Sequence, residues 1–121
     1  MESPYKGRTG LARAWNATRY SCAGLAAAAR NEAAFRELAL LLLVAVPVAL
    51  WLTADSVERA LMIGSVLLCL VVELLNAAVE ATVDRISLEN HRLAKRAKDI
   101  GSAAVMLALL NAAVIWLLIL V

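Results

Sequence analysis

Three long apolar stretches, separated by shorter polar segments, dominate the sequence. They cover residues 33–52, 60–83 and 100–121. Each approaches or exceeds the roughly 20 residues that a helix needs to cross a hydrocarbon core. Arg36 and Glu37 interrupt the first stretch near its start, where long side chains can reach the membrane interface. The pattern predicts an all-α membrane protein with three transmembrane helices in a single domain, residues 1–121.

A different pattern precedes the first apolar stretch. Apolar and small residues recur there at helical spacing on one side: Leu11, Trp15, Thr18, Cys22 and Leu25. Arginines occupy other positions of the same segment. A helix of this kind is suited to lying in the plane of the membrane interface. We therefore expect an amphipathic surface helix over residues 5–30, for which a purely anchoring role is the simplest interpretation.

Overall composition agrees with a membrane setting. Of the 121 residues, 63% are hydrophobic, and the mean hydropathy is +0.77. A soluble globule of this size needs more polar surface than such a chain can supply. The composition therefore argues against a small soluble protein.

Basic residues are distributed unevenly around the apolar stretches. Several precede the first stretch and several lie in the connection 84–99, whereas the connection 53–59 contains only Arg59. By the positive-inside rule, the N-terminus and the 84–99 connection are cytoplasmic, and the 53–59 connection and the C-terminus lie outside. The net charge of +2 then reflects topology and attraction to anionic lipid, and it gives no case for nucleic acid.

The second apolar stretch contains a set of polar residues with a regular spacing: Glu73, Asn76, Glu80 and Asp84. Steps of three and four residues, at about 100° per residue, place all of them on one face of a helix. A carboxylate at bilayer depth costs on the order of 2.5–3.5 kcal/mol on insertion scales. A short protein that retains such a stripe is expected to use it.

The remaining candidate residues are less specific on spacing alone. Cys22 and Cys69 lie in different environments, so we expect no disulfide and interpret both as small apolar fillers. His91 has no His or Cys partner at a metal-binding spacing, and is interpreted as an ordinary loop residue. For Glu32, close to the start of the first apolar stretch, a functional role and a plain surface charge are both open.

The basic 84–99 connection meets the acidic stripe at the cytoplasmic end of the second stretch. Carboxylates can hold a hard cation, and that cation together with Lys or Arg can hold phosphate oxygens. The chain contains no Walker motif, and Gly101-Ser102 after Asp99 is not a phosphate cradle. The residues alone leave two classes open: a membrane enzyme that handles a polyphosphate, and a small proton-coupled transporter. A transporter of that class would need a fourth span and has no use for the Lys98-Asp99 pair.

Three segments carry a resemblance to a known family: NEAAFR at 31–36, ELLNAAVEATVDR at 73–85, and RAKDIGSAA at 96–104. In order, spacing and chain length they resemble the integral-membrane diacylglycerol kinase of bacteria. The resemblance implies a homotrimer in the bacterial cytoplasmic (inner) membrane, with diacylglycerol as the lipid substrate. The trimer would transfer a phosphoryl group from ATP, with Mg²⁺, to the primary hydroxyl of diacylglycerol. The undecaprenol kinase branch of the same fold stays open, because the stripe and the phosphate residues do not contact the lipid tail.

The same resemblance assigns roles to individual residues. Glu73 is similar to the general base, and Glu32 with Glu80 to the metal-binding pair, while Asn76 and Asp84 are supporting residues. Expected ATP contacts are Arg13, Tyr20, Glu32, Glu80, Glu89, Asn90, His91, Lys98 and Asp99. Asn90 stands where a familiar member has an aromatic residue, which puts a stacking contact to adenine at that position in doubt. The substrate lipid is expected to contact Ala17, Thr18, Arg19, Tyr20, Ser21, Cys22, Ala26, Ala27, Ala28, Ala29, Ala34, Phe35, Arg36, Glu37, Leu38, Trp51, Leu52, Thr53, Ala54, Arg59, Ser102 and Trp116.

The third apolar stretch also predicts how subunits associate. Ala104, Ala108 and Ala112 form a small-residue face along a helix, which permits close packing between membrane helices. We expect an oligomer in which neighbouring subunits screen the acidic stripe from lipid and share active sites.

Overall fold

The structure, a computed structural model, describes residues 9–86 and 91–121. It contains four helices in this part of the chain: α1 (Gly10–Asn31), α2 (Ala33–Leu52), α3 (Ser56–Ile86) and α4 (Arg92–Leu120). The last three are long and apolar enough to cross a membrane. The predicted all-α class and the three candidate spans are therefore confirmed. α3 is longer than the apolar stretch 60–83 because it continues through Asp84 and Arg85.

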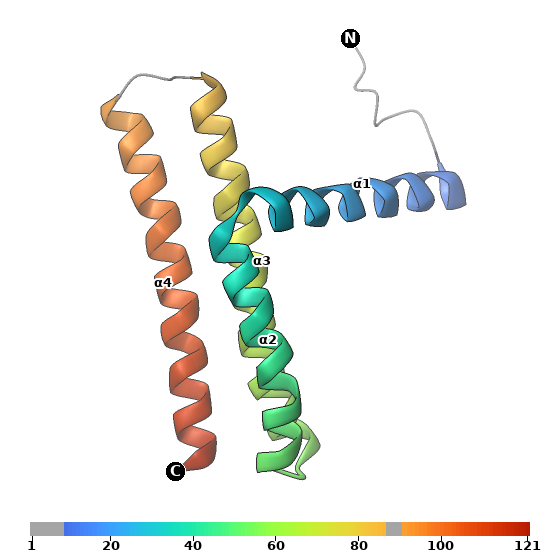
Figure 1. The fold of residues 1–121 in the computed structure, drawn as a ribbon, viewed down its shortest axis with the longest axis vertical. Coiled ribbons are helices and arrows are strands. Elements are labelled where there is room, and N and C mark those ends of the chain that lie inside the picture. The colour runs from blue at the N-terminus through green and yellow to red at the C-terminus, as the bar shows by residue number, and fades with distance from the viewer. Residues whose placement is uncertain (1–8, 87–90) are drawn as a thin grey trace.

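α2, α3 and α4 run alongside one another, whereas α1 projects sideways from the bundle (Figure 1). α3 is the central element, since it packs against both α2 and α4, and α1 packs mainly against α2. The end of α3 and the start of α4 lie at the opposite end of the bundle from the turn between α2 and α3.

A single residue, Glu32, separates α1 from α2. Its backbone is extended, with φ −118° and ψ 106°, and its N–H donates to the carbonyl of Ala28 at 2.8 Å. Arg36 follows one turn later and donates from Nη1 to the carbonyls of Ala29, at 2.9 Å, and Arg30, at 3.2 Å. These carbonyls lie at the end of α1, where no partner exists within the helix. Arg36, which is part of α2, therefore stabilises the corner by hydrogen bonding to the end of α1.

The turn between α2 and α3 is stabilised in a similar way. Arg59 donates from Nε to the carbonyl of Thr53 and from Nη2 to that of Leu50, both at 2.7 Å. Asp55 accepts the backbone N–H of Glu58 at 2.9 Å, as an N-capping carboxylate does. Free backbone carbonyls at the end of α2 and a free N–H at the start of α3 thus each bond to a nearby side chain.

The interior of the subunit is thin and built from small and medium side chains: Ala28, Phe35, Leu38, Cys69, Leu70, Ala108 and Ala112. Many leucines and valines of α2, α3 and α4 are exposed, as expected for helices that face lipid or other subunits. Ala108 and Ala112 are buried within the subunit, whereas Ala104 is exposed. The lower part of the predicted alanine face therefore packs inside one chain.

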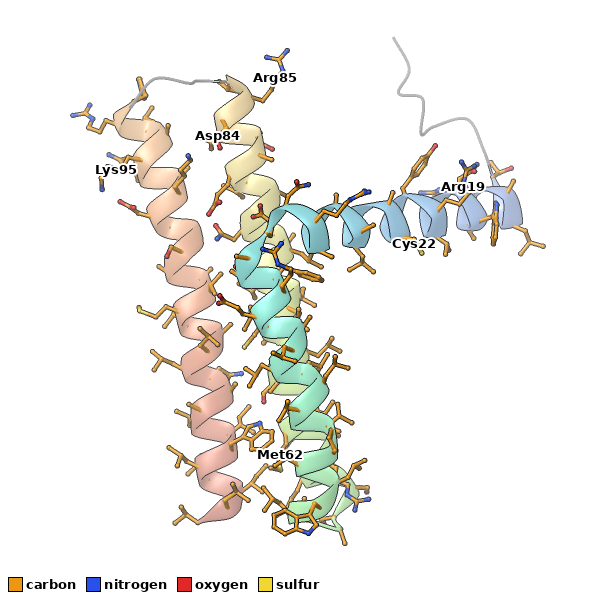
Figure 2. All side chains as sticks on the ribbon, in the orientation of Figure 1. Arg19, Cys22, Met62, Asp84, Arg85 and Lys95 are labelled. Atoms are coloured by element: carbon orange, nitrogen blue, oxygen red, sulfur yellow. The ribbon has the colours of Figure 1, made fainter. Side chains whose placement is uncertain are left out.

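The far end of the α3–α4 pair is fixed by hydrogen bonds to one carbonyl. Trp116 on α4 donates from Nε1 to the carbonyl of Met62 on α3 at 3.0 Å, and Ser65 donates to the same carbonyl at 2.8 Å. The Met62 and Cys69 side chains are completely buried. Figure 2 shows Met62 near the end of the bundle that is distant from Asp84.

Candidate functional site

The polar stripe of α3 passes from buried to exposed along the helix. Glu73 and Asn76 are 5% and 8% exposed, Glu80 is half-buried and Asp84 is exposed. Eleven residues separate the two ends, which is about 16 Å along a helix. The stripe therefore connects the interior of the subunit to the end of the bundle where the basic residues of α4 lie.

Asn76 is held between its own helix and α4. Its Nδ2 donates to Glu80 Oε1 at 3.2 Å. Its Oδ1 is buried and has no hydrogen-bond partner among the described residues. Gly101 of α4 lies directly against this amide, so that a Cβ at position 101 would overlap Oδ1. Only glycine at 101 leaves the Asn76 amide in its present position.

The basic residues of α4 form two ion pairs on different sides of that helix. Lys98 lies 2.6 Å from Asp84 of α3, and Lys95 lies 2.7 Å from Asp99 on α4 itself. All four side chains are substantially exposed to solvent. Pairs of this kind contribute only about 0–1 kcal/mol. An incoming phosphate can therefore replace Asp84 as the partner of Lys98 at small cost.

Glu32 meets the stripe from the α1–α2 corner. Glu32 lies near Ala77 and Ala81 of α3, which are the chain neighbours of Asn76 and Glu80. Glu32 also lines a groove of about 580 Å³ between α1 and α3, whose other walls are small residues such as Gly24, Ala28 and Ala78. Glu32 therefore lies in a groove of mostly small side chains, on a flank of α3 adjacent to the one that carries Glu73 and Glu80.

The donor set suits a magnesium ion that arrives with phosphate. In the described part of the chain, no group of three or more His, Cys, Asp or Glu side chains gathers to form a complete metal site. Mg²⁺ prefers oxygen ligands and usually takes only one or two carboxylates, with water and phosphate oxygens completing its shell. Glu32 and Glu80 fit that requirement, and the orphaned Asn76 oxygen beside Glu80 marks the same region as polar.

One subunit does not bring together all the residues predicted to bind ATP. Lys98 and Asp99 lie at the start of α4, while Arg13 lies near the outer end of α1, which extends away from the bundle (Figure 1). Arg13 is about 27 Å along α1 from the corner. Tyr20 lies on α1 between Arg13 and the corner. Glu89 and Asn90 fall outside the described residues.

His91 has a role that spacing did not reveal. It is the N-cap of α4, and its Nδ1 accepts the backbone N–H of Leu93 at 3.0 Å. The cap satisfies one of the free donors at the start of the helix. His91 thereby helps to fix the first turn of α4, on which the cationic residues stand.

The residues predicted to contact the lipid substrate fall in three separate places. One group follows α1 and the corner, and within it Phe35 and Leu38 are buried in the subunit. A second group surrounds the α2–α3 turn, where Arg59 is already bonded to backbone carbonyls. Ser102 and Trp116 lie on α4, far apart along its length. A single lipid molecule cannot reach all three places within one subunit.

Gly101 is the feature of the site that sequence reasoning missed. A glycine inside a helix costs about 1 kcal/mol relative to alanine, so its presence there can signal a close approach of another element. Gly101 stands nine residues into α4, and this signal was available. Its partner, Asn76, is identified only by the packing of α3 against α4.

Comparisons with known proteins agree on one family. A sequence profile described as prokaryotic diacylglycerol kinase matches residues 19–120. The chain is 60% identical over 118 residues to the diacylglycerol kinase of Pseudomonas aeruginosa, covering 98% of this chain and 96% of that protein. It is 50% identical over 112 residues to that of Escherichia coli K12, covering 93% and 92%. For the diacylglycerol kinase of Helicobacter pylori J99 the identity is 40% over 107 residues, covering 88% and 84%.

Proposed function

The chain belongs to the prokaryotic diacylglycerol kinase family, and on that premise we propose that it phosphorylates the primary hydroxyl of diacylglycerol with ATP. The products are phosphatidic acid and ADP. One observation carries the proposal: the Glu73, Asn76 and Glu80 stripe runs from the buried part of α3 toward the end of the bundle where Lys98 is held only by an exposed ion pair. This arrangement combines a buried carboxylate, a cation-binding carboxylate and a phosphate-binding cation.

In the proposed mechanism Glu73 accepts the proton of the diacylglycerol hydroxyl as its oxygen bonds to the γ-phosphorus. The bond between that phosphorus and the leaving ADP oxygen breaks in the same displacement. Glu73 is suited to the role because its carboxylate is buried within the apolar part of α3, at the depth of the membrane interior where the lipid acceptor resides. General-base catalysis of this kind typically contributes about 10²–10⁴-fold to the rate.

The remaining side chains bind and orient the nucleotide. Glu80 and Glu32 would hold Mg²⁺, which when bound neutralises the phosphate charge that develops during transfer. Lys98 exchanges Asp84 for a phosphate oxygen, and Asp99, Arg13, Tyr20 and the 89–91 segment complete the ATP contacts. Glu73 lies about 10 Å deeper along α3 than Glu80. The two carboxylates therefore act on different parts of the reacting pair, the hydroxyl and the metal-bound phosphate.

We also propose that the active enzyme is a homotrimer with shared sites. The separation of Arg13 from Lys98 within one subunit supports sharing, because a neighbouring α1 or α4 could close that gap. In the same proposal α1 lies in the cytoplasmic interface, with Leu11 and Trp15, 90% and 67% exposed in the isolated subunit, inserted among lipids. The N-terminus and the α3–α4 connection are then cytoplasmic, in the inner membrane.

The substrate assignment is tested with purified protein and radiolabelled ATP. Diacylglycerol should be labelled strongly and undecaprenol weakly or not at all. The opposite preference would assign the chain to the polyisoprenol branch. None of the comparisons favours that alternative or a transporter, since the relatives described above are all named diacylglycerol kinase.

Shared sites are tested by mixing inactive subunits. Trimers that combine Glu32→Gln and Glu73→Gln subunits should regain measurable activity, because some sites then draw an intact residue from each. Trimers made from either variant alone are the controls. Mixed trimers that form but stay inactive would restrict each site to one subunit.

A further inference from the structure

A basic groove on α4 is lined mostly by residues that have no role in the proposed catalytic site, with Asp99 as the exception. It has a volume of about 360 Å³ and is lined by one face of the helix: Arg92, Lys95, Arg96, Asp99, Ile100 and Ala103. Lys98 and Gly101 belong to a different side, because they contact Asp84 and Asn76 of α3. Figure 2 shows Lys95 on the side of α4 that is turned away from α3.

The charge in this groove is only partly compensated. Asp99 is its one acidic residue, and Lys95 already pairs with it at 2.7 Å. Within residues 9–86 and 91–121, the guanidinium groups of Arg92 and Arg96 make no hydrogen bond or ion pair. Both arginines are exposed. The groove therefore offers two guanidinium groups, each able to bind a phosphate oxygen with two parallel donors.

The groove changes from basic to apolar along the helix. Arg92 and Arg96 are followed on the same face of α4 by Ile100 and Ala103. Leu107 continues this apolar face one turn further along the helix. Ile100 and Leu107 are each 62% exposed. Arg96 lies only about 6 Å along the helix from Ile100. A ligand that fills this surface must carry an anionic group next to a long apolar part.

The position of the groove matches the level of a lipid phosphate. Gly101 of α4 lies opposite Asn76 of α3, and the groove between α1 and α3 reaches Leu74 to Ala81. α1 therefore crosses α3 close to the level at which the basic part of α4 becomes apolar (Figure 1). If α1 lies in the interface, as proposed above, Arg96 stands about 8 Å outside that level, among the headgroups, and Arg92 one turn further out with a side chain long enough to reach back to them. The inference thus rests on that part of the proposed function.

We propose that this groove binds an anionic glycerophospholipid of the surrounding bilayer. Arg92 and Arg96 hold its phosphate, and an acyl chain lies along Ile100, Ala103 and Leu107. In this role the lipid is a structural ligand, neither the acceptor nor the product of the kinase reaction. It fixes the depth of α4 in the membrane, and with it the depth of Lys98 and Gly101.

The test measures lipid retention on the full-length protein without diacylglycerol, first in the absence of nucleotide and then with added MgATP. Protein in nanodiscs of phosphatidylcholine with added phosphatidylglycerol of the same acyl chains is released into a mass spectrometer, and the bound lipids are counted. The double variant Arg92→Gln/Arg96→Gln should retain at least about fivefold less phosphatidylglycerol, since each cation near a membrane contributes roughly that factor. Arg92→Lys/Arg96→Lys should retain most of it.

A matched control removes the same charge from the same end of the molecule. Arg30→Gln/Arg85→Gln changes two exposed arginines of α1 and α3, and Figure 2 shows Arg85 pointing away from the bundle. Phosphatidylglycerol retention by this control should match the parent. Because no turnover is measured, a wrong kinase assignment would leave this result unaffected.

Three results would overturn the proposal. One is equal phosphatidylglycerol loss from the two Gln double variants, which would mean that only net charge matters. Another is displacement of phosphatidylglycerol by MgATP, which would assign the groove to nucleotide. The third is a changed subunit number in Arg92→Gln/Arg96→Gln, which would show that a second copy of the chain covers the groove.

Discussion

The two ends of the α3–α4 pair are built on different principles. At the end near the α2–α3 turn, Met62 is fully buried and Trp116 bonds to the Met62 carbonyl. At the other end, the contacts between the helices are a glycine against an amide and an exposed ion pair between Lys98 and Asp84. The first end fixes the pair of helices. The second leaves polar groups near the surface, where ligands can exchange with them.

Because of this difference, we expect substitutions at one end to lower mainly the activity and substitutions at the other end to lower mainly the stability. Changes at Glu73, Asn76 and Lys98 should affect turnover more than folding, because these polar side chains bury little apolar surface. Changes at Met62 should do the reverse. The following experiments are ordered by the size of the expected effect.

Glu73→Gln should lower kcat by about 10²–10⁴-fold, the usual contribution of a general base. The variant should fold at least as well as the parent, because a carboxylate at bilayer depth is destabilising. The measurements are steady-state phosphorylation of diacylglycerol and thermal unfolding in the same detergent. A Glu73→Gln protein within about tenfold of the parent kcat would contradict the assigned role.

Met62→Ala should destabilise the subunit by about 2–5 kcal/mol, since it removes a fully buried side chain and leaves a cavity. The kcat of the folded fraction should stay near that of the parent. Denaturation in mixed micelles gives the stability, and activity is normalised to folded protein. Met106→Ala, at a 56% exposed position of α4, is the control and should cost little. A large kcat loss in Met62→Ala would contradict the expectation that this end of the bundle affects stability and not turnover.

Lys98→Ala should raise the KM for ATP by about tenfold, because a charge-assisted hydrogen bond is worth roughly 1.5–3 kcal/mol. Stability should change little, since the pair with Asp84 is exposed. Arg85→Ala removes a neighbouring exposed charge and serves as the control. An unchanged KM would remove Lys98 from the set of ATP contacts.

Gly101→Ala should lower kcat by roughly threefold to tenfold. The new Cβ displaces the Asn76 amide and with it the hydrogen bond to Glu80, a bond worth about 0.5–1.5 kcal/mol. Raised magnesium should recover part of the loss if Glu80 is the displaced group. Gly64→Ala on α3 is the matched control, because a Cβ at position 64 would meet no atom within 4 Å. Equal effects of the two substitutions would show that helix propensity, and not Asn76, is responsible.

The sequence predicted the helices well and their contacts poorly. Runs of leucine, alanine and valine at helical length identify three spans without any knowledge of packing, and the spacing of Glu73, Asn76 and Glu80 places them on one face. The corner at Glu32, the two backbone bonds of Arg59 and the Trp116–Met62 link each join residues whose proximity depends on how helices meet. Nothing in the local pattern specifies those partners. Gly101 is intermediate, because a glycine inside a helix indicates a close contact but does not indicate that the contact is with Asn76.

The corner between α1 and α2 also limits how this protein can vary in length. Only Glu32 separates the two helices, and the Arg36 guanidinium binds the end of α1 across it. One residue inserted into this extended link would move the end of α1 by up to about 3.5 Å relative to α2, away from the Arg36 guanidinium. The face of α1 that meets the membrane and the direction of the Glu32 carboxylate would change together. Insertions and deletions between Asn31 and Ala33 should therefore be far more harmful than point substitutions on either side.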